Sequence, residues 1–300
     1  MLAAEAPDGT VFLAAQAPVD PAPSVVYVID GNGPAAVAEH FGSGIAALAA
    51  DANNLYVATY AAVTAFSRTS GNQVGQWTLP AVNSANASND DLVSMTAAAG
   101  RVFVSISQGN TVSMYTITPG STAAPALAAQ GLSAAIGPNG TIYYEGSSNR
   151  DLTALSTSGT STQGPALVDA PNSEGGGVQN IDVVAGGEVW VGEPAGQGED
   201  TQWTTYDATT LAQVGQFSGN LSELIADTVG GALVATSPNS QNPCTAQSPG
   251  YTSWCVSRIN PQGVQSQPLG GKNVVDLLGP EPVEIASQGT SNQIDVYRIS

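Results

Sequence analysis

Short apolar runs recur along the whole chain at spacings of 40 to 50 residues. They open near Val11, Leu55, Val102, Ile142, Val189, Leu233 and Val283. Polar turns rich in Gly, Asn and Asp flank the runs, and the runs themselves favour β-branched and aromatic residues, as strands do. A repeat of this length is typical of a propeller, in which each repeat forms one blade.

Each repeat contains four strand-like segments. In the second copy these are Ile45–Leu48, Leu55–Ala58, a segment that ends at Phe66, and Gln73–Trp77. No window combines helical spacing of apolar residues with helix caps, and 34 Gly and 19 Pro interrupt the chain too often for long helices. The pattern therefore predicts an all-β chain made of four-stranded antiparallel blades.

Because blades bury their faces only against one another, we expect one domain over residues 1–300, a seven-bladed β-propeller. The expected blades cover approximately residues 1–43, 44–90, 91–130, 131–177, 178–219, 220–271 and 272–300. The last copy stops at a third strand, so within this chain the last blade is expected to lack its outer strand. Residues before Met1 would complete that blade, or its edge would be exposed to pairing with another chain.

Charged residues are scarce, at 10% of the chain against a typical ~25%. Six Lys and Arg stand against 24 Asp and Glu, for a net charge of -18. Nucleic acids and acidic membrane surfaces are bound by clustered cations, so neither is an expected partner. The uncharged polar surface suggests a protein of the cell exterior, and one that tolerates acid, because it has few charge pairs to lose.

No apolar stretch approaches the ~20 residues of a membrane span. The opening residues also lack the basic region and apolar core of a signal peptide, so we expect any export signal to be absent from this chain. We expect an extracellular, periplasmic or cell-surface monomer.

Two cysteines, Cys244 and Cys255, fall in the longest insertion of the sixth repeat. A disulfide between them would stabilise the fold by roughly 2 to 3 kcal/mol and would point to an oxidising compartment. The alternative is a pair of reduced thiols without a role. Two cysteines alone make a zinc site an unattractive interpretation.

Several turns resemble the blade signatures of a known group of propellers. Ala6-Pro-Asp-Gly-Thr-Val-Phe12, Gly137-Pro-Asn-Gly-Thr-Ile-Tyr143 and Tyr27-Val-Ile-Asp30 are similar to segments of the YVTN, NHL and virginiamycin B lyase-like group. The resemblance covers all seven repeats. It implies a propeller that binds a protein or ligand or acts as a lyase or lactonase, and it identifies no catalytic residue.

The lyase activity of that group would require a catalytic histidine. The chain has one histidine, His40, on the expected outer strand of the first blade, so histidine-based catalysis is disfavoured. The lactonase-like members imply a divalent metal held by carboxylate and amide ligands.

An alignment of the first strands tests the implied metal site. It puts Ala3, Ala47, Ser94, Ala134, Asp182, Glu223 and Asp276 in one column. The three carboxylates could converge on one hard cation such as calcium, which prefers oxygen ligands. In the alternative they are solvated ends of strands, since an error of one residue in register would turn a side chain to the other face.

Two long insertions, in the fifth and sixth repeats, carry a candidate binding surface on one face. Its residues are Glu193, Glu199, Asp200, Trp203, Tyr251 and Trp254. Loops on a rigid scaffold commonly carry recognition, and aromatic residues are enriched at binding sites. Ordinary packing within the blades is the alternative for the aromatic residues.

These observations favour a non-enzymatic binding or scaffold module that uses loops around blades five to seven. A protein, above all a basic one, or a carbohydrate would suit its charge. The alternative function is a metal-dependent hydrolase or lactonase with Asp182, Glu223 and Asp276 as its carboxylates.

Overall fold

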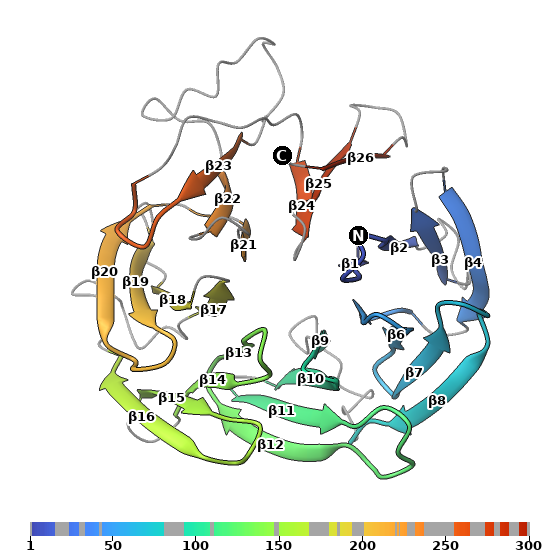
Figure 1. Cartoon of the computed structure of the whole chain (residues 1–300), viewed down its shortest axis with the longest axis horizontal. Helices are drawn as coiled ribbons and strands as arrows, with labels where there is room; N and C mark the ends of the chain where they lie inside the picture. The colour runs from blue at the N-terminus through green and yellow to red at the C-terminus, as the bar shows by residue number, and fades with distance from the viewer. Residues whose placement is uncertain are drawn as a thin grey trace. The chain divides into compact units, whose positions relative to one another are not determined.

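The computed structural model describes residues 2–15, 24–29, 34–41, 44–80, 93–108, 111–146, 150–167, 180–184, 187–193, 201–219, 221, 223–226, 232–236, 255–264, 274–278, 283–287 and 294–298. This part of the chain is all β, with strands β1 to β26 and no helix (Figure 1). It separates into two compact units, Met1–Ile142 and Tyr143–Ser300, which are described one at a time. Within the described residues, no helix has the length and apolarity needed to cross a membrane.

Three four-stranded antiparallel sheets belong to the first unit. The first has the order β1 (Leu2–Glu5), β2 (Val11–Ala15), β3 (Ser24–Ile29), β4 (Pro34–Phe41). The second has the order β5 (Ala47–Ala50), β6 (Asn54–Ala58), β7 (Ala62–Ser67), β8 (Gln73–Thr78). The third has the order β9 (Val93–Ala98), β10 (Arg101–Gln108), β11 (Thr111–Ile117), β12 (Ala126–Gly131).

The remaining strands form four further sheets. The order in the fourth is β13 (Ala134–Ile136), β14 (Ile142–Glu145), β15 (Asp151–Leu155), β16 (Ser161–Ala166). The order in the fifth is β17 (Asn180–Val184), β18 (Glu188–Glu193), β19 (Gln202–Asp207), β20 (Gln213–Ser218). Three described strands form the sixth, β21 (Glu223–Ala226), β22 (Ala232–Thr236), β23 (Cys255–Ile259), and three form the last, β24 (Val274–Leu278), β25 (Val283–Ser287), β26 (Ile294–Arg298). The prediction of an all-β chain with four-stranded antiparallel sheets is confirmed.

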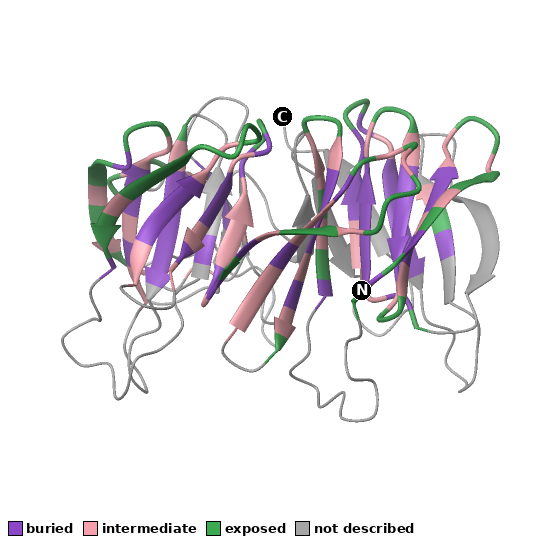
Figure 2. Cartoon of the chain, turned by 90° about the horizontal axis from the view of Figure 1, so that it is seen from below, coloured by how far each residue is buried: buried purple, intermediate pink, exposed green. Residues whose placement is uncertain are grey.

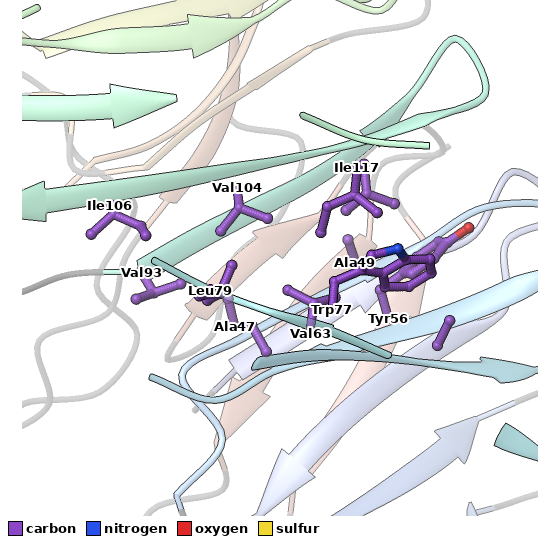
Figure 3. Close-up of a cluster of buried hydrophobic side chains, with 13 residues drawn as sticks. Ala47, Ala49, Tyr56, Val63, Trp77, Leu79, Val93, Val104, Ile106 and Ile117 are labelled. Carbon is purple, nitrogen blue, oxygen red and sulfur yellow. The ribbon is translucent and has the colours of Figure 1, made fainter. Parts of the chain in front are cut away.

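The second strand of each well-described sheet has buried side chains on both faces. Figure 2 shows the buried residues in purple along the strands. In the second sheet, Leu55 packs in a cluster with residues of the first sheet, and Tyr56 packs in a cluster with the third. Figure 3 shows the latter cluster, in which Trp77 and Val104 also take part. Because successive side chains point to opposite faces, one strand can serve both interfaces. A fully buried aliphatic side chain such as that of Val104 stabilises the fold by roughly 1.5 to 3 kcal/mol.

Polar side chains join neighbouring sheets of the first unit. The Arg68 guanidinium of the second sheet forms an ion pair with Asp8 of the first, with 2.6 Å between Nη2 and Oδ2, and also donates to Thr10. It lies over the ring of Phe12. Trp77 donates from Nε1 to the Ser121 carbonyl of the third sheet at 2.8 Å. These contacts fix neighbouring sheets beyond what apolar packing alone would do.

Every described fourth strand pairs with its neighbour through a shift of register. The shifts occur in the pairings of β4, β8, β12, β16 and β20. A bulge bends the strand and disturbs its outer row of hydrogen-bonding groups, which protects an edge against pairing with another chain. The sheets thus carry a repeated device against edge-to-edge association.

The packing shows which residues of two second strands correspond. Leu55 packs against the preceding sheet, and in the sixth sheet Ala232 packs against the preceding sheet, beside Trp190. Ala232 is therefore the counterpart of Leu55, and Leu233 is the counterpart of Tyr56.

Candidate functional site

The end of the fifth sheet that bears the β18–β19 connection is built around Trp203. Its ring lies against Gly192, where a Cβ atom would be 2.8 Å from the ring carbons, so only glycine fits at that position. The indole Nε1 of Trp203 donates to the Gly219 carbonyl at 3.0 Å. Trp203 is only 4% exposed. It therefore belongs to the core and not to the exposed aromatic surface expected for it, because the space above Gly192 admits the ring.

Hydrogen bonds between β19 and β20 fix the residues that follow this connection. The Gly219 amide donates to the Thr201 carbonyl at 2.9 Å. The Gln202 amide group donates to the Ser218 hydroxyl at 2.6 Å. On the other side, Glu193 ends β18 and lies opposite Gln202. The segment 194–200 thus begins and ends on a fixed framework.

The other predicted binding residues fall largely beyond what the structure describes. Glu199, Asp200, Tyr251 and Trp254 lie outside the described residues, and of Glu193 only the backbone is described. For the predicted disulfide, Cys255 begins β23 opposite Thr236, whereas Cys244 lies outside the described residues. The disulfide stays a prediction.

A second set of contacts joins the fifth and sixth sheets. Thr205 donates from its hydroxyl to the Pro261 carbonyl at 2.8 Å. Trp190 is fully buried in a cluster with Ala232 and Val234 of the sixth sheet, and within the fifth sheet its ring meets that of Phe217 edge-on with 5.7 Å between the centroids. These contacts hold β18, β19 and β20 against the sixth sheet, so both long insertions arise from one packed pair of sheets.

The turns at the opposite end of the fifth sheet bring two carboxylates together. Glu188 lies directly opposite Asp207 in the strand pairing. Partial burial raises the pKa of Glu188, and the nearby charge of Asp207 raises it further. Asp207 accepts hydrogen bonds from the backbone and hydroxyl of Thr210, which lower its pKa. The pair is placed on turns that close the sheet and is not near the candidate binding residues of the β18–β19 connection.

A buried ion pair in the second unit escaped the sequence analysis. The Glu145 carboxylate, fully buried at the end of β14, accepts from Nε of Arg150 at 2.6 Å. Its other oxygen, Oε2, has no hydrogen-bond partner. Arg150 has a left-handed backbone, with φ of 55°. The signal for this pair was available: one of only six cations follows a carboxylate by five residues across a short polar turn.

The three predicted metal ligands each lie in the first strand of a sheet in the second unit. Their partners in the second strands are Trp190 for Asp182, Ala235 for Glu223 and Ile285 for Asp276. Trp190 pairs with Thr205 and Leu233 with Arg258, each two residues before the start of the next turn at Asp207 or Asn260, so Trp190 corresponds to Leu233. The position of Glu223, opposite Ala235, is therefore displaced by two residues, about 7 Å along a strand, from that of Asp182. The column of the sequence alignment is therefore not one level of the sheets.

The side chains of these three residues are not among those described, so the metal site stays a prediction. Within the described residues no three His, Cys, Asp or Glu side chains are grouped as metal ligands would be. His40 lies in β4, the edge strand of the first sheet, as expected from its place in the repeat.

Comparisons with known proteins establish the fold alone. No protein-family model matches the chain, and no curated protein matches it, so the proposed relation to the YVTN and NHL group stays a prediction. Hsv2 of Kluyveromyces lactis is 10% identical to the chain, with a TM-score of 0.55 over 96% of this chain and 93% of that one. BamB of Moraxella catarrhalis is 13% identical, with a TM-score of 0.55 over 99% of this chain and 84% of that one. The protein lmo1340 of Listeria monocytogenes is 8% identical, with a TM-score of 0.55 over 97% of this chain and 90% of that one. All three are β-propeller proteins, and the likeness supports a β-propeller for this chain.

Proposed function

We propose that this chain is a seven-bladed β-propeller, secreted or held at the cell surface, that acts as a monomeric, non-enzymatic binding module. Its ligand, a protein or a carbohydrate, is held by the connections around blades five to seven. The observation that carries this proposal is the fixed framework at both ends of the segment 194–200. Glu193 pairs with Gln202 at its start, and the bonds of Thr201 and Trp203 to Gly219 hold the chain just after its end, so a connection that carries Glu199 and Asp200 has fixed flanks.

The net negative charge of the chain favours a neutral or basic partner. Net charge is -18, and two of the arginines, Arg68 and Arg150, are already engaged with carboxylates of the chain itself. Their positive charge is thus largely offset before a partner arrives. A basic surface would be attracted over a distance set by the ionic strength, whereas an acidic one would be repelled.

Calorimetric titration tests the binding function with two defined probes, a lysine-rich peptide and a neutral glucan. We compare the wild type with Glu199→Gln/Asp200→Asn and with Tyr251→Ala/Trp254→Ala. The matched control is Asp90→Asn/Asp91→Asn, which removes the same charge from a different blade. A basic ligand should lose affinity in the first variant and with added salt, and a glucan in the second.

The control variant separates a local site from the overall field. Equal losses in the control and in the Glu199 and Asp200 variant would contradict recognition by this connection. Binding of neither probe by the wild type would contradict both partner classes offered here.

A metal-dependent hydrolase or lactonase is the second candidate, supported by one observation. The strand that carries Asp182, β17, lies beside β21, which carries Glu223, and β21 lies beside β24, which carries Asp276. Three neighbouring first strands therefore each bring a carboxylate-bearing position. Calcium, the candidate cation, should raise the unfolding temperature of the wild type and leave the Asp182→Ala/Glu223→Ala/Asp276→Ala variant unchanged, because a ligand stabilises only the state that binds it.

Hydrolysis of simple lactones and esters, followed in the same two proteins, would then assign activity. An unfolding temperature that calcium does not change, with no lactone turnover, would dismiss this candidate and leave the binding module.

A further inference from the structure

The hairpin between β15 and β16 presents an unusual density of hydroxyl groups. Six of the seven residues from Ser156 to Thr162 are serine or threonine, and the seventh is Gly159. Residues 157–163 are all exposed. No charged residue occurs between Asp151 and Asp169. This hairpin is therefore a neutral and solvent-facing array of hydroxyls.

Half of these hydroxyls are used to build the turn. Ser156 and Ser158 share a hydrogen bond of 2.8 Å between their Oγ atoms, and Ser158 approaches Thr160 at 3.3 Å. The Thr160 amide donates to the Ser156 hydroxyl at 3.0 Å. Gly159 takes a left-handed conformation, with φ of 84°, which closes the turn without strain.

The other hydroxyls, those of Thr157, Ser161 and Thr162, are not engaged by any hydrogen bond among the described residues. Thr157 lies at the tip of the turn. Ser161 and Thr162 begin β16, the edge strand of its sheet, with Ser161 opposite Leu155. A transferase could therefore reach all three without unfolding the hairpin.

We propose that this hairpin is a site of O-linked glycosylation, at one or more of Thr157, Ser161 and Thr162. Exposed stretches rich in Ser and Thr and bounded by Pro, here Pro165, are a composition that carries O-linked sugars in exported proteins. The inference rests on the export that the proposed function includes. A sugar on β16 would also cover a sheet edge that has no charged side chain to protect it.

The modification is a group transfer from a sugar activated as a phosphate ester. The hydroxyl oxygen of the side chain forms a bond to C1 of the sugar while the bond between C1 and the phosphate oxygen breaks. The phosphate leaves with the electron pair, and the hydroxyl proton passes to a base of the transferase. Hydroxyls already bonded within the turn are poorer acceptors, because transfer would remove the donor of that bond.

Mass spectrometry of the full chain, isolated from its natural source, tests the proposal. Cleavage after Asp151 and Asp169 releases residues 152–169 as one peptide. We expect a peptide heavier by one or more sugar units, a mass lost on alkaline β-elimination, which releases sugars from Ser and Thr. Fragmentation should place the sugar on Thr157, Ser161 or Thr162.

Variants expressed in the same source provide the control. The triple change Thr157→Val/Ser161→Ala/Thr162→Val should abolish the added mass, while Thr210→Val should leave it unchanged, since the Thr210 hydroxyl already donates to Asp207 at 2.8 Å. An unmodified peptide, or a modification that β-elimination does not release as sugar, overturns the proposal. Cell fractionation measures export separately. A chain that is exported but carries no sugar would contradict the glycosylation proposal alone. A chain that carries sugar but stays in the cell would contradict the proposed location alone.

Discussion

The first strands of the sheets differ in sequence between the two units. In the first unit β1, β5, β9 and β13 are made largely of alanine and other small or apolar residues, and Glu5 is their one charged residue. In the second unit β17, β21 and β24 each contain one carboxylate. Sheets of this kind therefore form without a carboxylate in the first strand. The acidic positions of the second unit are not explained by the building of a sheet.

Charge follows the same division. Residues 1–142 contain 8 acidic and 2 basic residues, whereas residues 143–300 contain 16 acidic and 4 basic ones. The ion pairs differ as well: Asp8 of the first unit is 60% exposed in its pair with Arg68, while Glu145 of the second is fully buried in its pair with Arg150. Of these two paired carboxylates, the one in the first unit meets water and the one in the second is enclosed. Matched substitutions in the two units can measure what that difference costs.

The largest effect is expected from breaking the enclosed pair. Arg150→Ala leaves the Glu145 carboxylate buried without its cation, which should destabilise the fold by about 3 to 5 kcal/mol. Asp8→Asn in the first unit should cost less than about 1 kcal/mol, because the Asp8 carboxylate is exposed to solvent. Urea unfolding of both variants and the wild type measures the two costs.

Glu145→Gln/Arg150→Met serves as the control, because it removes both charges and leaves no unpaired ion. It should recover much of the stability that Arg150→Ala loses. Equal costs for Arg150→Ala and Asp8→Asn would contradict the contrast between an enclosed and an exposed carboxylate.

A smaller contrast is expected at one position shared by two outer strands. β8 and β20 have the related sequences Gln73-Val-Gly-Gln-Trp-Thr78 and Gln213-Val-Gly-Gln-Phe-Ser218. A Cβ atom at Gly215 would lie 2.1 Å from the Pro261 carbonyl oxygen, whereas at Gly75 it would meet the Trp77 ring at 2.6 Å. Backbone yields less readily than a side chain, so Gly215→Ala should cost about 3 kcal/mol and Gly75→Ala about 1 to 2 kcal/mol.

Thermal unfolding of the two alanine variants would rank them. Gly219→Ala is the control, because a Cβ there meets only Leu221, at 3.9 Å, and the substitution should have little effect. A larger loss at Gly75 than at Gly215 would mean that the sixth sheet can retreat from β20 more easily than Trp77 can turn aside.

The strands and their grouping into antiparallel sheets could be predicted from the sequence because local patterns determine them. The apolar run Leu55–Ala58 and the turn glycines around it define a strand wherever the chain carries them, and β6 spans Asn54–Ala58. Register could not be predicted, since it depends on turn lengths and bulges. Between Val274 and Asp276 the pairing with β25 shifts, which no composition signals.

The polar contacts that join the sheets also could not be predicted from the sequence. Arg68 and Asp8 are 60 residues apart, and Thr205 and Pro261 are 56 apart, so only the packed sheets bring them together. The burial of Trp203 could not be predicted from the sequence either. Its place beside an insertion suggested exposure, but the space left by Gly192 takes the ring into the core.

The smallest expected effects are on the pH dependence of stability. Their sign should differ between a carboxylate of the first unit, Asp8, and one of the second, Glu188. Hydrogen bonds from Arg68 hold the pKa of Asp8 at about 2, below the value of 3.8 for a free carboxyl. The folded state therefore binds this proton less readily than the unfolded state, so Asp8 stabilises the fold above about pH 4 and loses that contribution as the pH falls towards 2. Solvent screening keeps the effect below about 1 kcal/mol.

Glu188 of the second unit should behave in the opposite way. Burial raises its pKa above 4.5, so ionisation opposes folding at neutral pH and ceases to do so once the carboxyl is protonated in both states. Glu188→Gln should raise the unfolding free energy at pH 7 and have no effect below about pH 4, whereas Asp8→Asn should lower it at pH 7 and have no effect near pH 2. Urea unfolding of both variants and the wild type between pH 2 and 7 measures the two curves. Curves of the same sign would contradict the contrast between Asp8, whose ionised form is stabilised by Arg68, and Glu188, whose ionised form is opposed by burial.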